Sequence, residues 1–199
     1  MSDDDDVRFS ALLSLVSVLE KQNVDYRVGT GTLLGFIRDG GFIPWDWDVG
    51  IDVPAEHLLE QWEELVREIG GEGFSIKWKE KTILNGKISC VKNDVEFEIM
   101  GWRRDMFGGR RRRRLFIPAE VWQGGGVVEV GGRVFRTYSK PERYLEHFYG
   151  DWRAPVRAST ESEKSSYMAT GVRRRDYLDS ALYMPQWLSY NLRKWLGRY

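Results

Sequence analysis

Residues 45–53, WDWDVGIDV, alternate between two kinds of side chain with a period of two. Successive side chains of an extended strand point to opposite faces, so Asp46, Asp48, Gly50 and Asp52 should share one face. The tryptophans and aliphatic residues fall on the other face, and we expect them to lock the strand into the core. Three carboxylates on one face need a partner or a ligand, because ionised carboxylates are rarely buried alone.

The rest of the chain predicts the elements that surround this strand. Apolar spacing indicates helices over residues 7–23, 30–41, 55–70 and 140–150. Alternation and turn residues indicate strands at 24–29 and 94–102, with hairpins around Asn85-Gly86 and Gly131-Gly132. The order of helix, strand, short helix, strand, helix and then mostly strands is typical of an α+β domain with a mixed sheet.

Composition excludes several kinds of site. Lys+Arg and Asp+Glu balance at 30 each, so the overall charge argues for neither nucleic acid nor a membrane as partner. Cys90 is the only cysteine, which rules out a disulfide framework and a zinc site with two or more thiolates. The two histidines, His57 and His147, lie far apart in the sequence. Any bound metal should therefore have oxygen ligands, as Mg²⁺ or Mn²⁺ would.

No apolar run reaches the roughly 20 residues that would span a membrane. The sequence begins Met-Ser followed by four aspartates, the opposite of a basic signal peptide. We therefore expect a cytoplasmic protein, provided that the sequence is not a piece of a longer one.

The Asp46-x-Asp48 spacing has a specific chemical use. Side chains two apart on a strand lie about 6.5–7 Å from each other, and a divalent cation would remove the repulsion between their carboxylates. A third carboxylate on a neighbouring strand, Glu96 or Glu98, would complete an oxygen-rich site for phosphoryl or nucleotidyl transfer. The alternative, a polar face that meets solvent, is the more common meaning of an isolated D-x-D.

A Gly-Thr turn precedes the acidic strand. Residues 29–32, GTGT, follow a predicted strand and open a predicted short helix. Their backbone N–H groups and hydroxyls could bind an anion at the N-terminus of that helix. An ordinary strand–helix turn is an equally good explanation of these four residues alone.

Together these features resemble the signature of the LicD/fukutin family, a branch of the nucleotidyltransferase-fold superfamily. Its pattern runs G-T-L-L-G, an arginine, and then G-F-I-P-W-D-x-D. The matching residues are Gly31, Thr32, Leu33, Leu34, Gly35, Arg38, Gly41, Phe42, Ile43, Pro44, Trp45, Asp46 and Asp48. A weaker match covers residues 144–155, YLEHFYGDWRAP.

The resemblance implies a nucleotidyltransferase-like mixed sheet flanked by helices, with a catalytic domain over residues 1–155. Residues 156–199 would form a polar linker and a helical C-terminal extension packed on it. The implied reaction moves a phospho-alcohol, such as phosphocholine or ribitol phosphate, from a CDP-linked donor to a sugar hydroxyl of a glycan, with release of CMP.

The resemblance also implies roles for individual residues. Asp46, Asp48 and Glu98 would hold Mg²⁺ or Mn²⁺, and a carboxylate that is not fully engaged could take the proton of the acceptor hydroxyl. Gly31 and Thr32 would lie near the donor phosphates. Arg38 would be either a phosphate contact or part of a structural ion pair.

Two departures from the family pattern affect this site. Many members have an Asp-rich run where this chain has Trp47 and Gly50, and the third carboxylate is usually an Asp before two apolar residues. Glu98, followed by Ile99 and Met100, fits that slot best, while Glu96 shares its face but fits less well. Asp52 has no counterpart in the signature, so we leave it out of the predicted site.

Other functions remain open from the sequence. A nucleotidyltransferase that moves NMP onto a small molecule, protein or RNA would use the same fold and metal. A catalytically idle module that binds nucleotides or glycans would keep the fold alone.

Arg110–Arg114 could be a solvated loop, a contact for an anionic acceptor or a nucleic-acid site, although no interleaved aromatics favour single-stranded RNA. Tyr138, Tyr144, Tyr149 and Trp152 could stack on a base or sugar, and packing is the commoner role. A basic helix predicted over residues 186–199 could lie on a membrane surface or dock onto protein.

Overall fold

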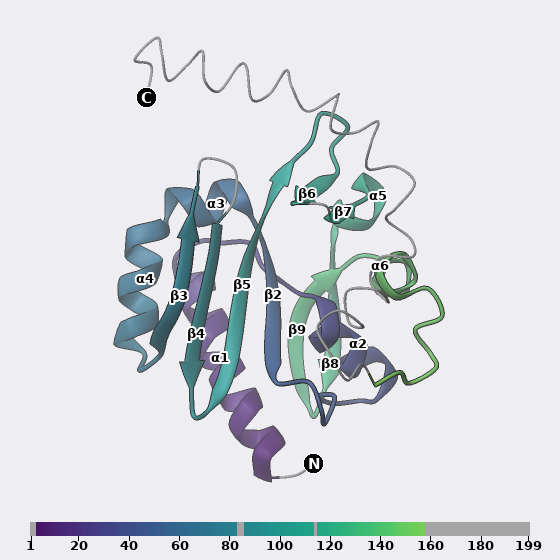
Figure 1. Ribbon diagram of the computed structural model, residues 1–199, viewed down its shortest axis with the longest axis horizontal. Helices are drawn as coiled ribbons and strands as arrows, with labels where there is room; N and C mark the ends of the chain where they lie inside the picture. Colours follow the sequence, from purple (N-terminus) through teal and green to yellow (C-terminus); the bar gives the residue numbers. More distant parts are fainter. Residues whose placement is uncertain (1–2, 83–85, 114, 158–199) are drawn as a thin grey trace.

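A mixed sheet with strand order β1-β2-β5-β4-β3 forms the centre of the protein, in which β2 and β5 run parallel and the other pairs run antiparallel. The computed structural model describes residues 3–82, 86–113 and 115–157, and Figure 1 shows how their elements are arranged. The helices are α1 (Asp3–Lys21), α2 (Thr30–Arg38), α3 (Ala55–Glu60), α4 (Trp62–Gly71), α5 (Ala119–Trp122) and α6 (Pro141–Tyr149). The strands are β1 (Arg27–Val28), β2 (Asp48–Pro54), β3 (Ser75–Lys81), β4 (Gly86–Lys92), β5 (Val95–Arg104), β6 (Arg110–Arg112), β7 (Leu115–Ile117), β8 (Gly125–Val130) and β9 (Arg133–Tyr138). The predicted α+β class with a mixed sheet and flanking helices is confirmed.

The two faces of the sheet differ in character, as the alternation predicts. One face is apolar, and Val49, Ile51, Phe97 and Ile99 on it are fully buried. Helix α1 lies behind the sheet and α4 lies beside it (Figure 1), where the Phe74 ring after α4 meets Phe97 edge-on. The other face carries the acidic residues of β2 and β5, so hydrophobic burial fixes the side on which they lie.

A hairpin of β8 and β9 lies next to β1, together with α2 and α6 (Figure 1). The Thr137 hydroxyl on β9 donates to the carbonyl of Val28, at 3.2 Å. An aromatic group of Phe9, Phe36 and Phe135 joins α1, α2 and β9. Residues more than a hundred positions away are thereby brought against the turn between β1 and α2.

The acidic strand starts later than the alternation predicts. Asp46 donates its backbone N–H to the carbonyl of Ile43, so the chain turns there and becomes a strand only at Asp48. As a result Trp45 and Trp47 are 38% and 61% exposed. The prediction that they lock the strand into the core is wrong, because Phe42 and Ile43 occupy the buried positions instead.

Three other segments refine the predictions. The helix predicted over residues 55–70 is two helices, α3 and α4, separated at Gln61. The hairpin at Gly131-Gly132 is confirmed, with φ of 58° and 70°. A second tight turn, Asn93-Asp94, with φ of 53° and 61°, joins β4 and β5, and two positive φ angles are what a two-residue hairpin requires.

Strands β3 and β4 pair antiparallel as predicted, but Gly86 is opposite Lys81 and belongs to β4, so it is not part of a two-residue turn. Residues 83–85 lie outside the described part. The predicted helix at 186–199 and most of the predicted linker also lie outside it. Among the described helices, none is long and apolar enough to cross a membrane.

Candidate active site

The Gly-Thr turn, residues 29–32, crosses the polar face of β2 at very close range. A β-carbon added to Gly29 would lie 1.9 Å from Asp52 Oδ2, and one added to Gly50 would lie 2.1 Å from Thr30 Oγ1. Two hydrogen bonds fix the crossing: Gly29 N–H donates to the Gly50 carbonyl at 3.2 Å, and Gly50 N–H donates to Thr32 Oγ1 at 2.9 Å. Glycine is therefore required both at Gly29 in the turn and at Gly50 in the acidic strand for the two segments to lie this close.

Asp46 lies at the end of this crossing, against the first turn of α2. Its Oδ2 would be 2.0 Å from a β-carbon on Gly31. The backbone carbonyl of Asp46 accepts a hydrogen bond from Arg8 of α1, whose guanidinium also lies over the Phe42 ring at 4.8 Å. Arg8 is buried and was missed from the sequence. The available signal was an arginine directly beside the apolar face of the first helix.

The register of β2 and β5 brings the candidate third carboxylates alongside. Asp48 is paired with Glu96, and Gly50 is paired with Glu98. Glu96 accepts hydrogen bonds from Lys77 and from the Ser89 hydroxyl, both at 2.8 Å, and these bonds lower its pKa below the ordinary value. Glu98 is instead engaged by the Lys87 ammonium.

The metal site predicted from the sequence remains a prediction. Among the described residues, no group of three or more His, Cys, Asp or Glu side chains lies close enough together to hold a metal ion. Mg²⁺, however, is commonly held by one or two carboxylates, with water and substrate phosphates completing its shell. Asp46 and Asp48 would be two such carboxylates. Their role as metal ligands stays a prediction, as does that of Glu98, which the Lys87 ammonium engages.

The residues that were predicted to contact phosphate, Gly31, Thr32 and Arg38, differ in their surroundings. Thr30 and Gly31 are half-buried at the start of α2, whereas Thr32 is buried and its oxygen already binds Gly50. Arg38, at the far end of α2, forms a two-pronged pair with Asp39 at 2.8 and 2.7 Å. The structure thus contains the ion-pair alternative for Arg38, and its contact with phosphate remains a prediction.

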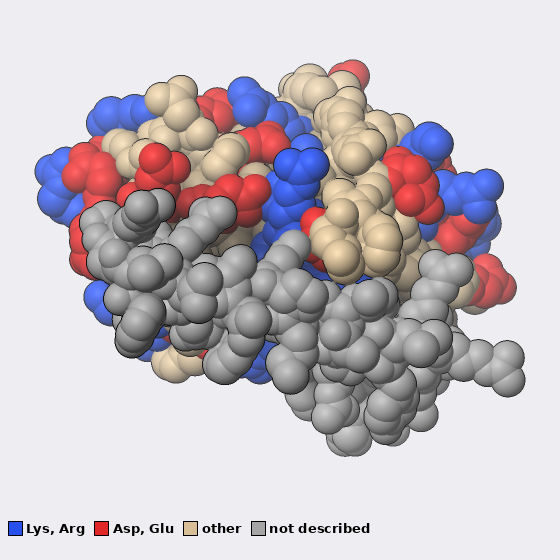
Figure 2. All heavy atoms as spheres, turned by 90° about the horizontal axis from the view of Figure 1, so that it is seen from above, with Lys and Arg blue, Asp and Glu red and all other residues tan. Residues whose placement is uncertain are grey.

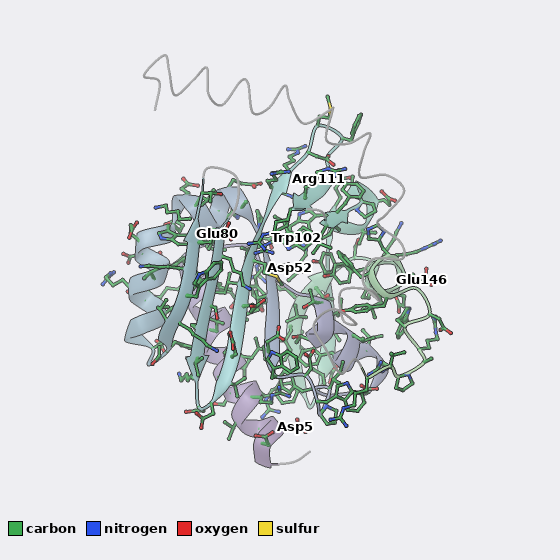
Figure 3. All side chains as sticks on the ribbon, in the orientation of Figure 1. Asp5, Asp52, Glu80, Trp102, Arg111 and Glu146 are labelled. Carbon is green, nitrogen blue, oxygen red and sulfur yellow. The ribbon has the colours of Figure 1, made fainter. Side chains whose placement is uncertain are left out.

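Asp52 was not part of the predicted site, but it is the centre of a buried cluster. Trp102 Nε1 donates to its Oδ1 at 2.6 Å, and the hydroxyls of Tyr138 and Tyr144 donate to its Oδ2 at 2.5 and 3.1 Å. Figure 3 shows Asp52 and Trp102 side by side on the neighbouring strands β2 and β5. Burial raises the pKa of Asp52, and the three donors and the nearby Arg112 charge oppose that rise. We call Asp52, Trp102, Tyr138 and Tyr144 the Asp52 cluster.

Sequence patterns do not predict this cluster, because its members come from three strands and a helix that are distant in the chain. Tyr138 and Tyr144 stack at 4.1 Å between ring centres and are fully buried, as is nearly all of Trp152. For these three residues the packing alternative is confirmed. Tyr144 has a further contact, because its oxygen accepts the N–H of Thr30 at 3.0 Å.

The arginine run is mainly interior. Arg110–Arg112 form strand β6 rather than a loop. Arg110 pairs with Glu56 at 2.6 Å and donates to the Trp102 carbonyl at 3.1 Å, while Arg112 is buried. Only Arg113 among the described members of the run is well exposed, and it pairs with Glu80 at 3.1 Å. On the face seen in Figure 2, the acidic and basic side chains that are drawn in colour are intermixed.

Comparison with solved structures finds similar chains at low sequence identity. The antibiotic-resistance factor ANT(2'')-Ia in solution matches with a TM-score of 0.50 and 15% identity, over 96% of this chain and 98% of that chain. A crystal structure of ANT(2'')-Ia with adenylyl-2''-tobramycin has a TM-score of 0.46 at 15% identity, over 90% and 98% of the two chains. A putative nucleotidyltransferase from Thermotoga maritima has a TM-score of 0.44 at 18% identity, over 96% of each chain. The first of these likenesses supports a nucleotidyltransferase fold.

Among curated proteins, no sequence matches this chain. The family comparison is positive: residues 23–108 match the nucleotidyltransferase domain described as LicD/FKTN/FKRP. The matched segment contains the Gly-Thr turn, Asp46, Asp48 and both candidate third carboxylates. Residues 23–108 are therefore similar to the LicD/FKTN/FKRP nucleotidyltransferase domain, and this similarity supports a nucleotidyltransferase-like transferase.

Proposed function

We propose that the protein transfers a phospho-alcohol from a CDP-linked donor to a sugar hydroxyl of a glycan, with Mg²⁺ or Mn²⁺ as cofactor. The observation that carries the proposal is the approach of Asp46 to Gly31, which puts a carboxylate at the N-terminus of α2. That N-terminus is also the natural place for the donor diphosphate. Two anionic groups sharing one helix end favour a divalent cation between them.

In this proposal, Asp46 and Asp48 hold the metal, which would neutralise the diphosphate and orient it. The backbone N–H groups of Gly31 and Thr32, near the start of α2, and the Thr30 hydroxyl bind the phosphate oxygens from the other side. Binding in this manner fixes the phosphorus in line with the acceptor, and positioning is the main protein contribution to such reactions.

The group transfer itself needs one base. The acceptor oxygen forms a bond to the phosphorus that carries the alcohol, while the bond from this phosphorus to the CMP oxygen breaks. The proton of the acceptor hydroxyl passes to a carboxylate and CMP departs. Glu96 and Glu98 are both candidates for this role. The hydrogen bonds from Lys77 and Ser89 lower the pKa of Glu96 and make it a weaker base, and Glu98 is engaged by the Lys87 ammonium.

The test does not require the acceptor to be known. Purified protein is incubated with CDP-choline or CDP-ribitol and Mn²⁺, and slow hydrolysis is followed as CMP release, with water in place of the sugar hydroxyl. We expect CMP release by the unmodified protein and its loss in Asp46→Asn and in Asp48→Asn, with an unchanged melting temperature in each. Full turnover by Asp46→Asn would contradict the assignment of this residue.

Parallel reactions with the four nucleoside triphosphates cover the alternatives. Pyrophosphate release from a triphosphate, without CMP release from the CDP-alcohols, would indicate an NMP transferase instead. Thermal stabilisation by nucleotides with no turnover of any donor would indicate an idle binding module.

A further inference from the structure

Thr30 adopts a backbone conformation that its side chain disfavours. Its φ is 48°, in the left-handed region, which is rare and unfavourable for a β-branched residue. Such conformations persist only where the surroundings impose them, and they gather at functional sites. Thr30 is also the first residue of α2, so its conformation decides where the N-terminus of that helix points.

One side chain from outside the family match contacts the backbone of Thr30. The N–H of Thr30 donates to the Tyr144 oxygen at 3.0 Å, and the Tyr144 oxygen lies 3.1 Å from Asp52 Oδ2. Since the amide can only donate, the single phenol hydrogen of Tyr144 is left for the carboxylate. The two hydrogen bonds therefore run in one direction, from the Thr30 N–H to the Tyr144 oxygen and from the Tyr144 hydroxyl to Asp52. We call these two bonds the relay.

Asp52, at the far end of the relay, is held at both of its carboxylate oxygens. Trp102 and Tyr138 donate to the two oxygens of Asp52, and the residue is fully buried. Gly29 passes so close that its added β-carbon would be 1.9 Å from Asp52 Oδ2 and 3.1 Å from the Tyr144 hydroxyl. A carboxylate fixed by these two donors and a tight backbone crossing can hold Tyr144 in one orientation.

We propose that Asp52 and Tyr144 are positioning residues, which keep Thr30 left-handed and so direct the N-terminus of α2 and the Thr30 hydroxyl toward the donor diphosphate. The diphosphate part of this inference rests on the proposed function. The relay also makes residues 138–144 part of the working site, although the family match ends at residue 108. Neither residue touches the reacting atoms.

The chain contains a matched pair of variants for the test. Tyr144→Phe and Tyr138→Phe each remove one buried phenol hydroxyl that donates to the same oxygen of Asp52. Only Tyr144→Phe also removes the acceptor of the Thr30 amide. A general loss of packing would affect both variants alike, whereas loss of the relay affects one.

The first measurement needs no ligand. Hydrogen–deuterium exchange of peptides that cover residues 27–34 is compared at equal distance from each variant's melting temperature. We expect about tenfold faster exchange in Tyr144→Phe than in Tyr138→Phe at these residues, because the lost hydrogen bond corresponds to about that factor. Peptides from β3 and β4 should exchange equally in the two variants.

The second measurement uses pyrophosphate with Mn²⁺, a probe that carries the diphosphate without any base or alcohol. We expect Tyr144→Phe to weaken pyrophosphate binding about tenfold and Tyr138→Phe to weaken it by less than threefold. If cytidine donors prove wrong but pyrophosphate binding still separates the two variants, the proposed function fails and the positioning role stands.

Equal exchange at residues 27–34 in the two variants would overturn the proposal, whatever their stabilities. If Tyr144→Phe does not fold, Asp52→Asn replaces it, because the amide keeps the shape of the carboxylate but is a weaker acceptor for Tyr144. Faster exchange in Asp52→Asn than in Tyr138→Phe would then support the relay, and equal or slower exchange would overturn it.

Discussion

The carboxylate of Asp46 occupies space that a β-carbon on Gly31 would need, with Oδ2 only 2.0 Å from that position. Gly31 lies within α2 and is not at a positive φ, so its backbone conformation alone does not call for glycine. The close approach of Asp46 is what requires glycine at this position. A similar close approach occurs within β2, where Gly50 leaves room for the Thr30 hydroxyl.

Gly31→Ala should therefore impair activity far more than stability. The new methyl group displaces the end of a flexible side chain, and alanine is favoured over glycine inside a helix. A displacement of about 1 Å at a catalytic carboxylate can lower turnover on the order of 100-fold. CMP release and the melting temperature, measured on the same preparation, separate the two effects.

Gly41→Ala is the control for this change, because a β-carbon there meets nothing within 4 Å and the residue is not at a positive φ. It should retain turnover and stability. Equal activity of the Gly31 and Gly41 variants would show that the position of Asp46 against α2 is unimportant.

The identity of the third carboxylate can be decided through its lysines. Lys87 engages Glu98, whereas Lys77 engages Glu96. If Glu98 is a metal ligand, Lys87→Met removes a competing cation and should lower the Mn²⁺ concentration for half-maximal CMP release about fivefold, since partly exposed pairs contribute up to about 1 kcal/mol. Lys77→Met serves as the matched control and should leave that concentration unchanged.

The reverse pattern would assign the role to Glu96. No shift in either variant would contradict a third carboxylate ligand and leave Asp46 and Asp48 as the pair that holds the ion.

Local patterns predicted the parts of this site that depend on neighbouring residues. Period-two alternation placed Asp48, Gly50 and Asp52 on one face of β2, and the Gly-Thr turn was expected at the start of a helix. The same alternation failed at Trp47, because a turn closed by Asp46 and Ile43 precedes the strand. Periodicity describes side-chain direction only where the backbone is extended.

The Asp52 cluster could not be predicted in this way, because it depends on tertiary contacts. Asp52 meets Tyr138 and Tyr144 only after the β8–β9 hairpin and α6 have packed beside β1. The pattern instead made Asp52 resemble a spare member of an acidic face. Likewise, the arginine run has the composition of a solvated loop, and only its pairing with β5 and Glu56 makes it interior.

Burial of Asp52 predicts a specific pH dependence of stability. Its pKa is raised above the ordinary 3.8 mainly by burial, so the native state holds this proton more tightly than the unfolded chain does. The contribution of Asp52 to the free energy of unfolding therefore falls as the pH rises from about 4 toward the raised pKa. Glu68 and Glu96, whose pKa values are lowered, act in the opposite direction.

Asp52→Asn isolates this contribution, since the remaining carboxylates are common to both proteins. We expect the melting temperature of the unmodified protein minus that of Asp52→Asn to decrease between pH 4 and pH 7. A difference that is constant or increases over this range would mean that Asp52 is not buried with a raised pKa. Thermal unfolding followed by circular dichroism at several pH values provides the measurement.

Substitutions of Arg110 and Arg113 should differ in their effect on the stability of the protein. The Arg110 guanidinium is nearly buried against Glu56 and the Trp102 carbonyl, whereas the Arg113 side chain is 62% exposed. Arg110→Met should lower the free energy of unfolding by about 2 kcal/mol, or roughly 4–8 °C in melting temperature, because two charged hydrogen bonds are lost. Arg113→Met should change it by less than about 0.5 kcal/mol.

Salt-dependent RNA binding, measured on the same two variants, tests the nucleic-acid alternative. A phosphate contact predicts binding that weakens with salt and is reduced in Arg113→Met, the exposed member of the pair. The interior placement of β6 predicts instead that neither the unmodified protein nor Arg113→Met binds RNA appreciably at physiological salt. Tight binding that is lost in Arg113→Met would mean that the exposed end of the run serves a polyanion, while the effect of Arg110→Met on stability would still report the ion pair with Glu56.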